Sequence, residues 1–287
     1  MDHHDVDGRH VVSSGTGPAV VLLHGWPHTW FLWRHVIARL RTTHRVIAPD
    51  LRGLGASRRT AEGYDLHTGA DDVVATMDAL GVADALVVGI DLGAPIAAMT
   101  ALRHPDRVRG LAVTEGLLGR LPGAEDFPPP WWFGFHGVPG LAETVLAGHE
   151  AEYLDWFYRA GTADGVGIAP EARDAFVAAY ADPVSLRCGF AYYRAMDVHA
   201  EQLAAAGRLT VPALAVAGGV VGDAVGRQLD GIADDVTHVA VPGCGHLVPE
   251  EQPDALAAHL AGFDRTCGGR SGPAPHPVSP GSPRRSR

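Results

Sequence analysis

Lysine is absent from this sequence: all 23 basic residues are arginine, whereas aspartate and glutamate together number 33. The resulting formal net charge of −10 argues against nucleic acid and against an anionic membrane surface as partners. The missing lysine, together with heavy use of alanine, glycine, valine and aspartate, is typical of a GC-rich genome and indicates an actinobacterial source. That inference concerns codon usage and carries no mechanism.

Cysteine and long apolar runs are also scarce. Cys188, Cys244 and Cys267 are an odd number without metal-ligand spacing, which predicts unpaired thiols in a reducing cytosol and no metal site. No apolar run approaches the roughly 20 residues of a membrane span. The N-terminus lacks the basic and apolar regions of a signal peptide. We therefore expect a cytoplasmic protein with no membrane partner, in which His3 and His4 are solvated.

What the chain does contain is a regular alternation of strand and helix patterns. Strand-like runs occupy residues 10–14, 19–25, 44–50, 85–90 and 108–115, and helical spacing occupies 30–40, 68–80 and 91–102. This alternation predicts an α/β fold built on a mostly parallel, doubly wound sheet.

The alternation stops at about residue 116. Proline-rich turns, aromatic clusters and helical stretches follow, and the strand-helix pattern resumes near residue 212 and ends with a helix at 253–263. The pattern predicts one core made of residues 1–116 and 208–264, interrupted by a helical cap at 117–207. Residues 265–287 are rich in glycine, proline, serine and arginine, which predicts a disordered tail.

The segment VVGIDLGAPIAA at 87–98 runs from a buried strand into a helix and displays Asp91 at the bend. Hydrolases with a G-x-S-x-G elbow place a nucleophilic serine there. A carboxylate that attacks a saturated carbon forms an ester, which water can cleave at its carbonyl, whereas serine would form an ether. Asp91 therefore indicates displacement at saturated carbon, such as epoxide opening or halide expulsion. An acid that caps the helix is the structural alternative.

Hydrolysis of such an ester needs a base and an acid that orients it. His246, in a glycine-rich turn between a strand and the last helix, is the candidate base, and the order nucleophile-then-histidine is that of α/β-hydrolases. Two acids could orient it. Glu115 ends the strand after the nucleophile strand and is favoured, while Asp223 follows the later strand ALAVAG and is the alternative, unless it caps a helix.

The segment LLHGWPHTW at 22–30 completes the predicted core site. Its turn can direct the Trp26 backbone N–H into the site, where it would bind the oxyanion together with the Leu92 N–H. Pro27 fixes the turn, and we expect His24 to hold the loop by hydrogen bonding rather than to act as a base.

Taken together, these motifs resemble the epoxide-hydrolase branch of the α/β-hydrolase fold, with a helical cap inserted in the core. The resemblance covers roughly residues 8–263 and rests on six segments. These are HGWP at 24–27, DLRGLGAS at 50–57, GIDLG at 89–93, PPWWFGFH at 129–136, FAYYRAM at 190–196 and GCGHLVPEE at 243–251. Relatives with similar cap motifs also keep their acid after the strand that Glu115 ends, which supports Glu115.

The resemblance implies two ring-opening donors in the cap. The first maps to Tyr193, the tyrosine that precedes arginine. The second falls on Trp132, because relatives commonly read Trp-His-Phe where this chain reads Trp131-Trp132-Phe133. That is a departure, since an indole N–H can donate a hydrogen bond but cannot usefully release its proton. Tyr193 would be the acid, and Trp132 would only hold the oxygen by a hydrogen bond. Trp131 is the alternative candidate for the second donor. Simple cap packing is the structural alternative.

The same cap suggests the substrate. A flat apolar wall would suit an aryl or polycyclic epoxide, which the actinobacterial composition would connect with natural-product biosynthesis. No cofactor is implied, and the oligomeric state stays open, with a homodimer as one option. The residues expected in the wall are Trp131, Trp132, Phe133, Phe135 and Tyr192.

Two other functions compete with epoxide hydrolysis. Haloalkane dehalogenases typically place tryptophan directly after the nucleophile, where this chain has Leu92, and fluoroacetate-type enzymes use arginines where it has Leu92 and Pro95. A non-catalytic binding protein of the same fold should have lost part of the triad, and every member has a candidate here. Both alternatives are therefore disfavoured.

Overall fold

A computed structural model describes residues 1–268 as an eight-stranded sheet with helices on both faces. The strand order is β1-β2-β4-β3-β5-β6-β7-β8, and pairing is parallel from β4 to β8 and antiparallel for β1 with β2 and for β2 with β4. The predicted α/β-hydrolase fold is confirmed. The strands are β1 (Asp2–Val6), β2 (Arg9–Ser14), β3 (Ala19–Leu23), β4 (Arg45–Pro49), β5 (Ala85–Ile90), β6 (Val108–Thr114), β7 (Ala213–Ala217) and β8 (Val236–Ala240).

The first strand was not predicted from the sequence. The terminal histidines were expected to be solvated, and His3 is exposed whereas His4 is half-buried; both lie in β1 at the edge of the sheet. The His3 and His10 rings approach to 2.8 Å between nitrogens, and His4 Nε2 lies 2.8 Å from the Ser13 hydroxyl. Pairing with β2, which polar alternation in so short a segment does not reveal, orders this end of the chain.

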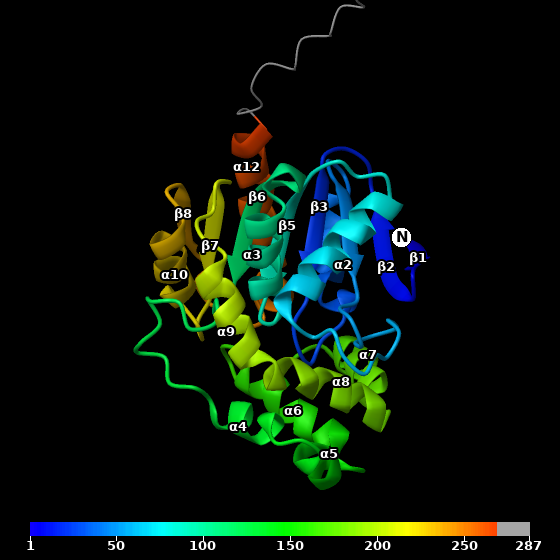
Figure 1. Cartoon of the computed structure of the whole chain (residues 1–287). Coiled ribbons are helices and arrows are strands. Elements are labelled where there is room, and N and C mark those ends of the chain that lie inside the picture. The colour runs from blue at the N-terminus through cyan, green and yellow to red at the C-terminus, as the bar shows by residue number, and fades with distance from the viewer. Residues whose placement is uncertain (269–287) are drawn as a thin grey trace, which may run out of the picture.

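Helices cover both faces of the sheet and bury its central strands. In Figure 1, α2 (Leu66–Ala79) and α3 (Gly93–Arg103) lie in front of the sheet and α12 (Pro253–Gly268) lies behind it, where it packs on α1 (Arg34–Leu40). Because both faces are covered, β3 and β5 are buried along their whole length. The remaining core elements are η1 (Trp30–Trp33), η2 (Pro105–Arg107), α10 (Ala224–Ile232) and α11 (Val248–Glu251).

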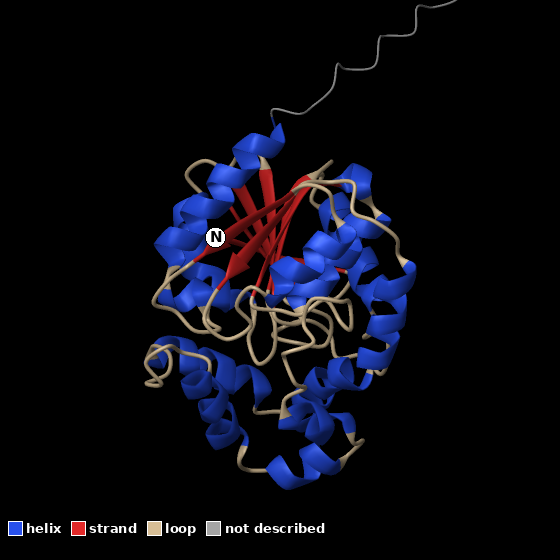
Figure 2. Cartoon of the chain, turned by 90° about the vertical axis from the view of Figure 1, so that its left-hand side faces the viewer, coloured by secondary structure: helices blue, strands red, loops and turns tan. Residues whose placement is uncertain are grey.

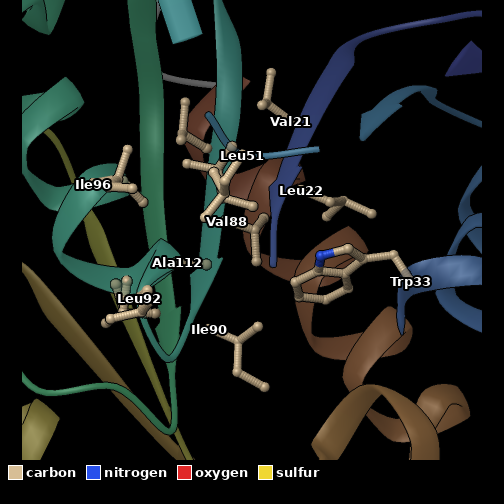
Figure 3. Packing of buried hydrophobic residues seen from close by; sticks show 14 of the residues in the cluster. Val21, Leu22, Trp33, Leu51, Val88, Ile90, Leu92, Ile96 and Ala112 are labelled. Carbon is tan, nitrogen blue, oxygen red and sulfur yellow. The ribbon is translucent and has the colours of Figure 1, made fainter. Parts of the chain in front are cut away.

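The core between the layers is formed by branched aliphatic residues. Figure 3 shows Val21 and Leu22 of β3 beside Val88 and Ile90 of β5, with the Trp33 ring against them. Burying side chains of this size stabilises the fold by roughly 1.5–3 kcal/mol each, and the packing fixes where the strands end.

A helical insertion separates β6 from β7. Within residues 115–212 the structure has six helices and no strand, and Figure 2 shows them as a separate layer below the sheet, with loops between the two. This insertion supports the predicted core at 1–116 and 208–264 and cap at 117–207, a division that stays a prediction. Its helices are α4 (Trp131–Gly137), α5 (Leu141–Leu146), α6 (Glu150–Ala160), α7 (Pro170–Tyr180), α8 (Pro183–Arg194) and α9 (Met196–Ala205).

The end of the chain needs one correction. The tail was predicted to begin at residue 265, but α12 continues through Gly268, with Asp264 and Cys267 buried on its inner side. The rest of the predicted tail lies outside the described residues. None of the helices within residues 1–268 is both long and apolar enough to cross a membrane.

Candidate active site

The site lies at the edge of the sheet where the parallel core strands end. Trp26 follows β3, Asp91 follows β5, Glu115 follows β6 and His246 lies in the loop after β8. Since β3, β5, β6, β7 and β8 are parallel neighbours, their carboxyl ends meet at one edge of the sheet. The fold therefore brings together residues that are far apart in the sequence, as the strand pattern predicted.

Asp91 occupies the bend between β5 and α3 in a strained backbone conformation. Its φ angle is +52°, which side chains other than glycine rarely adopt, and such strain commonly marks functional positions. The Trp26 N–H donates to Asp91 Oδ1 at 2.8 Å. Gly25 makes this approach possible, because a Cβ on Gly25 would lie 2.3 Å from Oδ1. One carboxylate oxygen is thus held by the backbone while the other faces the base.

His246 lies between two carboxylates. Its Nε2 is 3.6 Å from Asp91 Oδ2, and its Nδ1 is 3.5 Å from Glu115 Oε2. These distances are longer than good hydrogen bonds but within the range that tightens when substrate binds. The structure therefore brings the predicted nucleophile, base and favoured acid into one row.

The alternative acid lies elsewhere. Asp223 precedes α10 at the protein surface, its side chain is 77% exposed, and it forms an ion pair with Arg227 at 2.5 Å. An acid so exposed and paired with arginine cannot orient an imidazole in the site. This geometry supports Glu115.

Glu115 is fully buried and is held by the backbone. Its two oxygens accept hydrogen bonds from the N–H groups of Gly218 and Val221 at 2.8 Å each and of Gly222 at 3.1 Å. Burial would raise the pKa of Glu115, but the neighbouring His246 and these donors outweigh it and lower the pKa. Glu115 is therefore an anion that three donors keep in place. The sequence did not reveal these donors, because no side chain takes part.

The charges of Asp91 and His246 depend on each other. Burial raises the pKa of Asp91, and the opposite charge of His246 together with the Trp26 and Leu92 N–H groups offsets only part of this rise. Burial alone would lower the pKa of His246, but Glu115 and Asp91 outweigh it and raise the pKa. The imidazole is thus more easily protonated while Asp91 carries its charge.

His24 holds the Trp26 loop, as predicted. Its Nδ1–H donates to Gly25 O at 2.7 Å, and its Nε2 accepts from the Leu51 N–H at 3.0 Å. Burial lowers the pKa of His24, and the nearby Asp50 offsets only part of this effect, so the ring stays neutral. The fully buried ring has no route to a substrate.

A cavity of about 620 Å³ lies between this catalytic row and the cap. Its volume is typical of small-molecule sites. Most of its walls are apolar and aromatic, and besides Asp91, Glu115 and His246 the lining includes Trp26, His28, Leu92, Leu117, Phe127, Trp132, Phe133, Trp156, Phe157, Tyr193, Met196, His199 and Leu247.

The predicted cap donors both line this cavity. Tyr193 is buried in α8, with its ring 5.9 Å from Trp26 and 5.4 Å from Phe133, measured between centroids. Burial and then the charge of Asp91 raise the pKa of Tyr193 well above its ordinary value, so its hydroxyl keeps its proton. Trp132 lies in α4, with its ring 5.4 Å from that of Phe157.

Three residues of the predicted aromatic wall lie elsewhere, and for them the prediction was wrong. Trp131 is 57% exposed on the outer side of α4, and Phe135 packs against it there. Tyr192 faces away from the cavity, donates its hydroxyl to Arg52 O at 3.0 Å and packs on Tyr64. Trp156 and Phe157 of α6 complete the wall instead. The sequence does not reveal them, because the side of each cap helix that faces the cavity is set by its contacts with the other cap helices.

Within residues 1–268, no group of three or more histidine, cysteine, aspartate or glutamate side chains is arranged to hold a metal ion. The chemistry that the described residues offer is that of a carboxylate nucleophile, a histidine base and a phenol donor around an apolar cavity.

Comparison with known proteins agrees with this fold and identifies epoxide hydrolases among the relatives. Residues 18–253 match the alpha/beta hydrolase fold family. The chain is 34% identical to the soluble epoxide hydrolase of Corynebacterium sp. (strain C12), over 85% of this chain and 89% of that protein. It is 29% identical to epoxide hydrolase A of Mycobacterium tuberculosis, over 88% of this chain and 92% of the relative. The solved structure of the epoxide hydrolase CorEH without ligand superposes with a TM-score of 0.85 at 31% identity, covering 92% of this chain and 98% of the other.

Proposed function

Because the chain belongs to the epoxide hydrolase family of the α/β-hydrolase fold, we propose that it converts epoxides to vicinal diols through an ester on Asp91. One observation carries this proposal. A carboxylate, rather than a hydroxyl, stands at the strained elbow, with Oδ1 held by the Trp26 N–H and Oδ2 facing His246 beneath an apolar cavity.

In the first step Asp91 Oδ2 attacks a ring carbon of the epoxide. The bond from that carbon to the ring oxygen breaks, and the released alkoxide takes the proton of the Tyr193 hydroxyl. Trp132 donates only a hydrogen bond to the same oxygen. Alkylation converts Asp91 to a neutral ester, which removes one of the charges that raise the pKa of Tyr193 and so eases proton donation.

In the second step His246 removes a proton from water, which attacks the ester carbonyl carbon. Negative charge then collects on Oδ1, where the N–H groups of Trp26 and Leu92 stabilise it. Glu115 stabilises the imidazolium that forms. The tetrahedral intermediate breaks its bond to the alkyl oxygen, which leaves as the diol with the proton from His246. The proton left on the Asp91 carboxyl returns Tyr193 to its neutral form, and one water oxygen stays in the Asp91 carboxylate.

The cavity favours a substrate with an aromatic body. Trp132, Phe133 and Phe157 offer ring faces and edges on the cap side, and Trp26 does so on the core side. Aromatic pairs of this kind are worth about 0.5–1.5 kcal/mol beyond their buried area. We therefore expect an aryl or polycyclic epoxide to be opened faster than a short aliphatic one. A natural-product intermediate would meet this description.

Isotope labelling tests the ester. Phenyl glycidyl ether and excess enzyme are combined in ¹⁸O water for one turnover, and Asp91 is then examined by peptide mass spectrometry. We expect label in the Asp91 carboxylate and unlabelled oxygen in the first diol. Label in the first diol with none in Asp91 would show direct attack by water and overturn the scheme.

A further inference from the structure

The cavity wall contains one ionisable side chain that the mechanism leaves unused and the protein leaves half-paired. Two ionisable residues of the wall outside the catalytic group already have partners. Arg120 pairs with Asp197, and Glu125 accepts from the Gly123 N–H. Both ring nitrogens of His28 are fully buried and have no hydrogen-bond partner among the described residues, with the ring edge-on to Phe176, so a ligand in the cavity does not reach them. The ionisable residues of the wall are His28, Asp91, Glu115, Arg120, Glu125, Tyr193, His199 and His246, and the one still to be explained is His199.

Hydrogen bonding fixes the tautomer of His199. Its Nε2 lies 2.8 Å from the backbone carbonyl oxygen of Tyr64. A carbonyl oxygen can only accept, so Nε2 carries the proton. Burial lowers the pKa of His199, and the Tyr64 carbonyl and the Asp65 charge offset only part of this, so the ring is neutral. Nδ1 is therefore an acceptor, and within residues 1–268 it has no protein partner.

The His199 side chain lines the substrate cavity. Helix α9 carries the chain from the cap back toward the sheet (Figure 1), and Met196 and His199, three residues apart on one face, both line the cavity. His199 is only 5% exposed, yet its Nδ1 is not enclosed as the His28 nitrogens are. The bond to Tyr64 holds the ring in place before any ligand arrives.

We infer that His199 is a specificity-determining residue whose Nδ1 accepts a hydrogen bond from a hydroxyl group on the body of the substrate. This inference rests on the proposed epoxide hydrolysis and narrows its substrate class to hydroxylated aryl epoxides. An apolar substrate that covers Nδ1 leaves a buried acceptor unpaired, and a substrate that offers only an acceptor repels its lone pair. Sites built to pair with a substrate hydroxyl reject analogues that lack it.

The test uses phenyl glycidyl ethers that carry one ring substituent: hydroxyl, methyl or methoxy, each at the ortho, meta or para position. Methyl matches hydroxyl in size, and methoxy has the oxygen but no donor. For at least one ring position, we expect kcat/KM for the hydroxyl compound to exceed those of both partners by about tenfold. The favoured position locates Nδ1 relative to the reacting carbon.

Three variants assign this preference to His199. His199→Phe should reduce the ratio of hydroxyl to methyl kcat/KM to about one. His199→Asn keeps a polar group near the position of Nδ1 but does not reach Tyr64, so it should restore part of the ratio. His149→Phe, the same change at an exposed site, should leave the ratio as it is. Thermal melts show which variants are folded, and a ratio is read only from those that are.

Several outcomes would overturn the inference. It fails if methyl or methoxy compounds match the hydroxyl compound at every position, or if folded His199→Phe keeps the ratio. It also fails if Asn and Phe lower all nine rates equally, which would show a structural role through Tyr64. The proposed function survives these results as long as diols form. If none of the nine epoxides is opened, the proposed function falls and takes this inference with it.

Discussion

The two halves of the site are built by different means. On the core side the carboxylates of Asp91 and Glu115 are held by backbone N–H groups at 2.8–3.1 Å. On the cap side Tyr193 and Trp132 are held by ring contacts with centroids 4.5–6.2 Å apart. Hydrogen bonds from the backbone fix one geometry, whereas ring contacts allow a range. The core is therefore suited to chemistry that is the same for every substrate, and the cap to the part that varies.

If the core supplies the chemistry, loss of its base should have the largest effect. We expect His246→Gln to lower turnover by about 10⁴-fold or more, as loss of a triad member does elsewhere. Alkylation does not need the base, so the ester should accumulate, and intact mass spectrometry should show the protein increased by the mass of one epoxide. In the double variant with Asp91→Ala the adduct should vanish. A His246→Gln protein that gains no mass from an epoxide turned over by the wild type would contradict the scheme.

Loss of the orienting acid should have the next largest effect. Glu115→Gln removes the charge that supports the imidazolium and should slow ester hydrolysis by about 10³- to 10⁴-fold. Asp223→Asn is the matched control, because that acid is exposed and paired with Arg227, and we expect no more than a twofold change. Single-turnover decay of the ester measures both rates. The reverse ranking would move the acid to Asp223.

The contrast between the halves also explains what sequence could predict. Asp91, Glu115 and His246 were found because each follows a strand, and the ends of parallel strands meet wherever the sheet forms. The position after a strand is a property of the backbone pattern. The donors at Gly218 and Val221 escaped notice because a backbone N–H has no signature in the sequence.

The cap was harder to predict because its inward face depends on packing. Trp131 and Trp132 are adjacent in the sequence, but one is exposed and the other lines the cavity. Choosing between them requires knowing how α4 is rotated about its axis relative to α6 and α8. That rotation is set by the contacts between these helices. His199 escaped for a related reason, since its tautomer depends on a carbonyl 135 residues away.

Among the cap residues, loss of the proton donor Tyr193 should lower the rate of alkylation most. Tyr193→Phe keeps the ring contacts but removes the acid, so alkylation should slow by about 10²-fold or more, within the range of general acid catalysis. Single-turnover kinetics, in which ester formation precedes ester decay, measure this step apart from hydrolysis. A halide leaves as a stable anion and needs no proton. Ready halide release together with full-rate Tyr193→Phe would therefore replace epoxide opening with dehalogenation.

The second cap donor should have a smaller effect. Trp132→Phe keeps an aromatic wall while removing one N–H, and we expect the alkylation barrier to rise by about 1 kcal/mol, or roughly fivefold in rate. Trp131→Phe is the matched control: it makes the same change one residue earlier, at an exposed site, and should leave the rate unchanged. Equal effects of the two changes would show that Trp132 acts through the packing of α4 rather than as a donor.

The smallest expected effect is a displacement of the pH profile rather than a loss of rate, and it tests how the carboxylates act on the base. In the free enzyme, burial lowers the pKa of His246, but the nearby Glu115 and the charge of Asp91 outweigh it and raise the pKa. Ester formation removes the Asp91 charge and leaves the burial. The pKa of His246 must therefore be lower in the ester than in the free enzyme.

Ester hydrolysis requires neutral His246, so its rate should fall as pH drops through the pKa of His246 in the ester. We expect this acid limb, from single-turnover decay, to lie below the pKa of His246 measured by NMR titration of the free enzyme. In Glu115→Gln the limb should lie lower still, since the largest remaining carboxylate effect on the pKa of His246 is gone and only the smaller effect of Glu251 is left. The plateau rate should fall as well. A limb at or above the free-enzyme pKa would show that Asp91 does not set the charge of His246, and the coupling between nucleophile and base would be lost from the scheme.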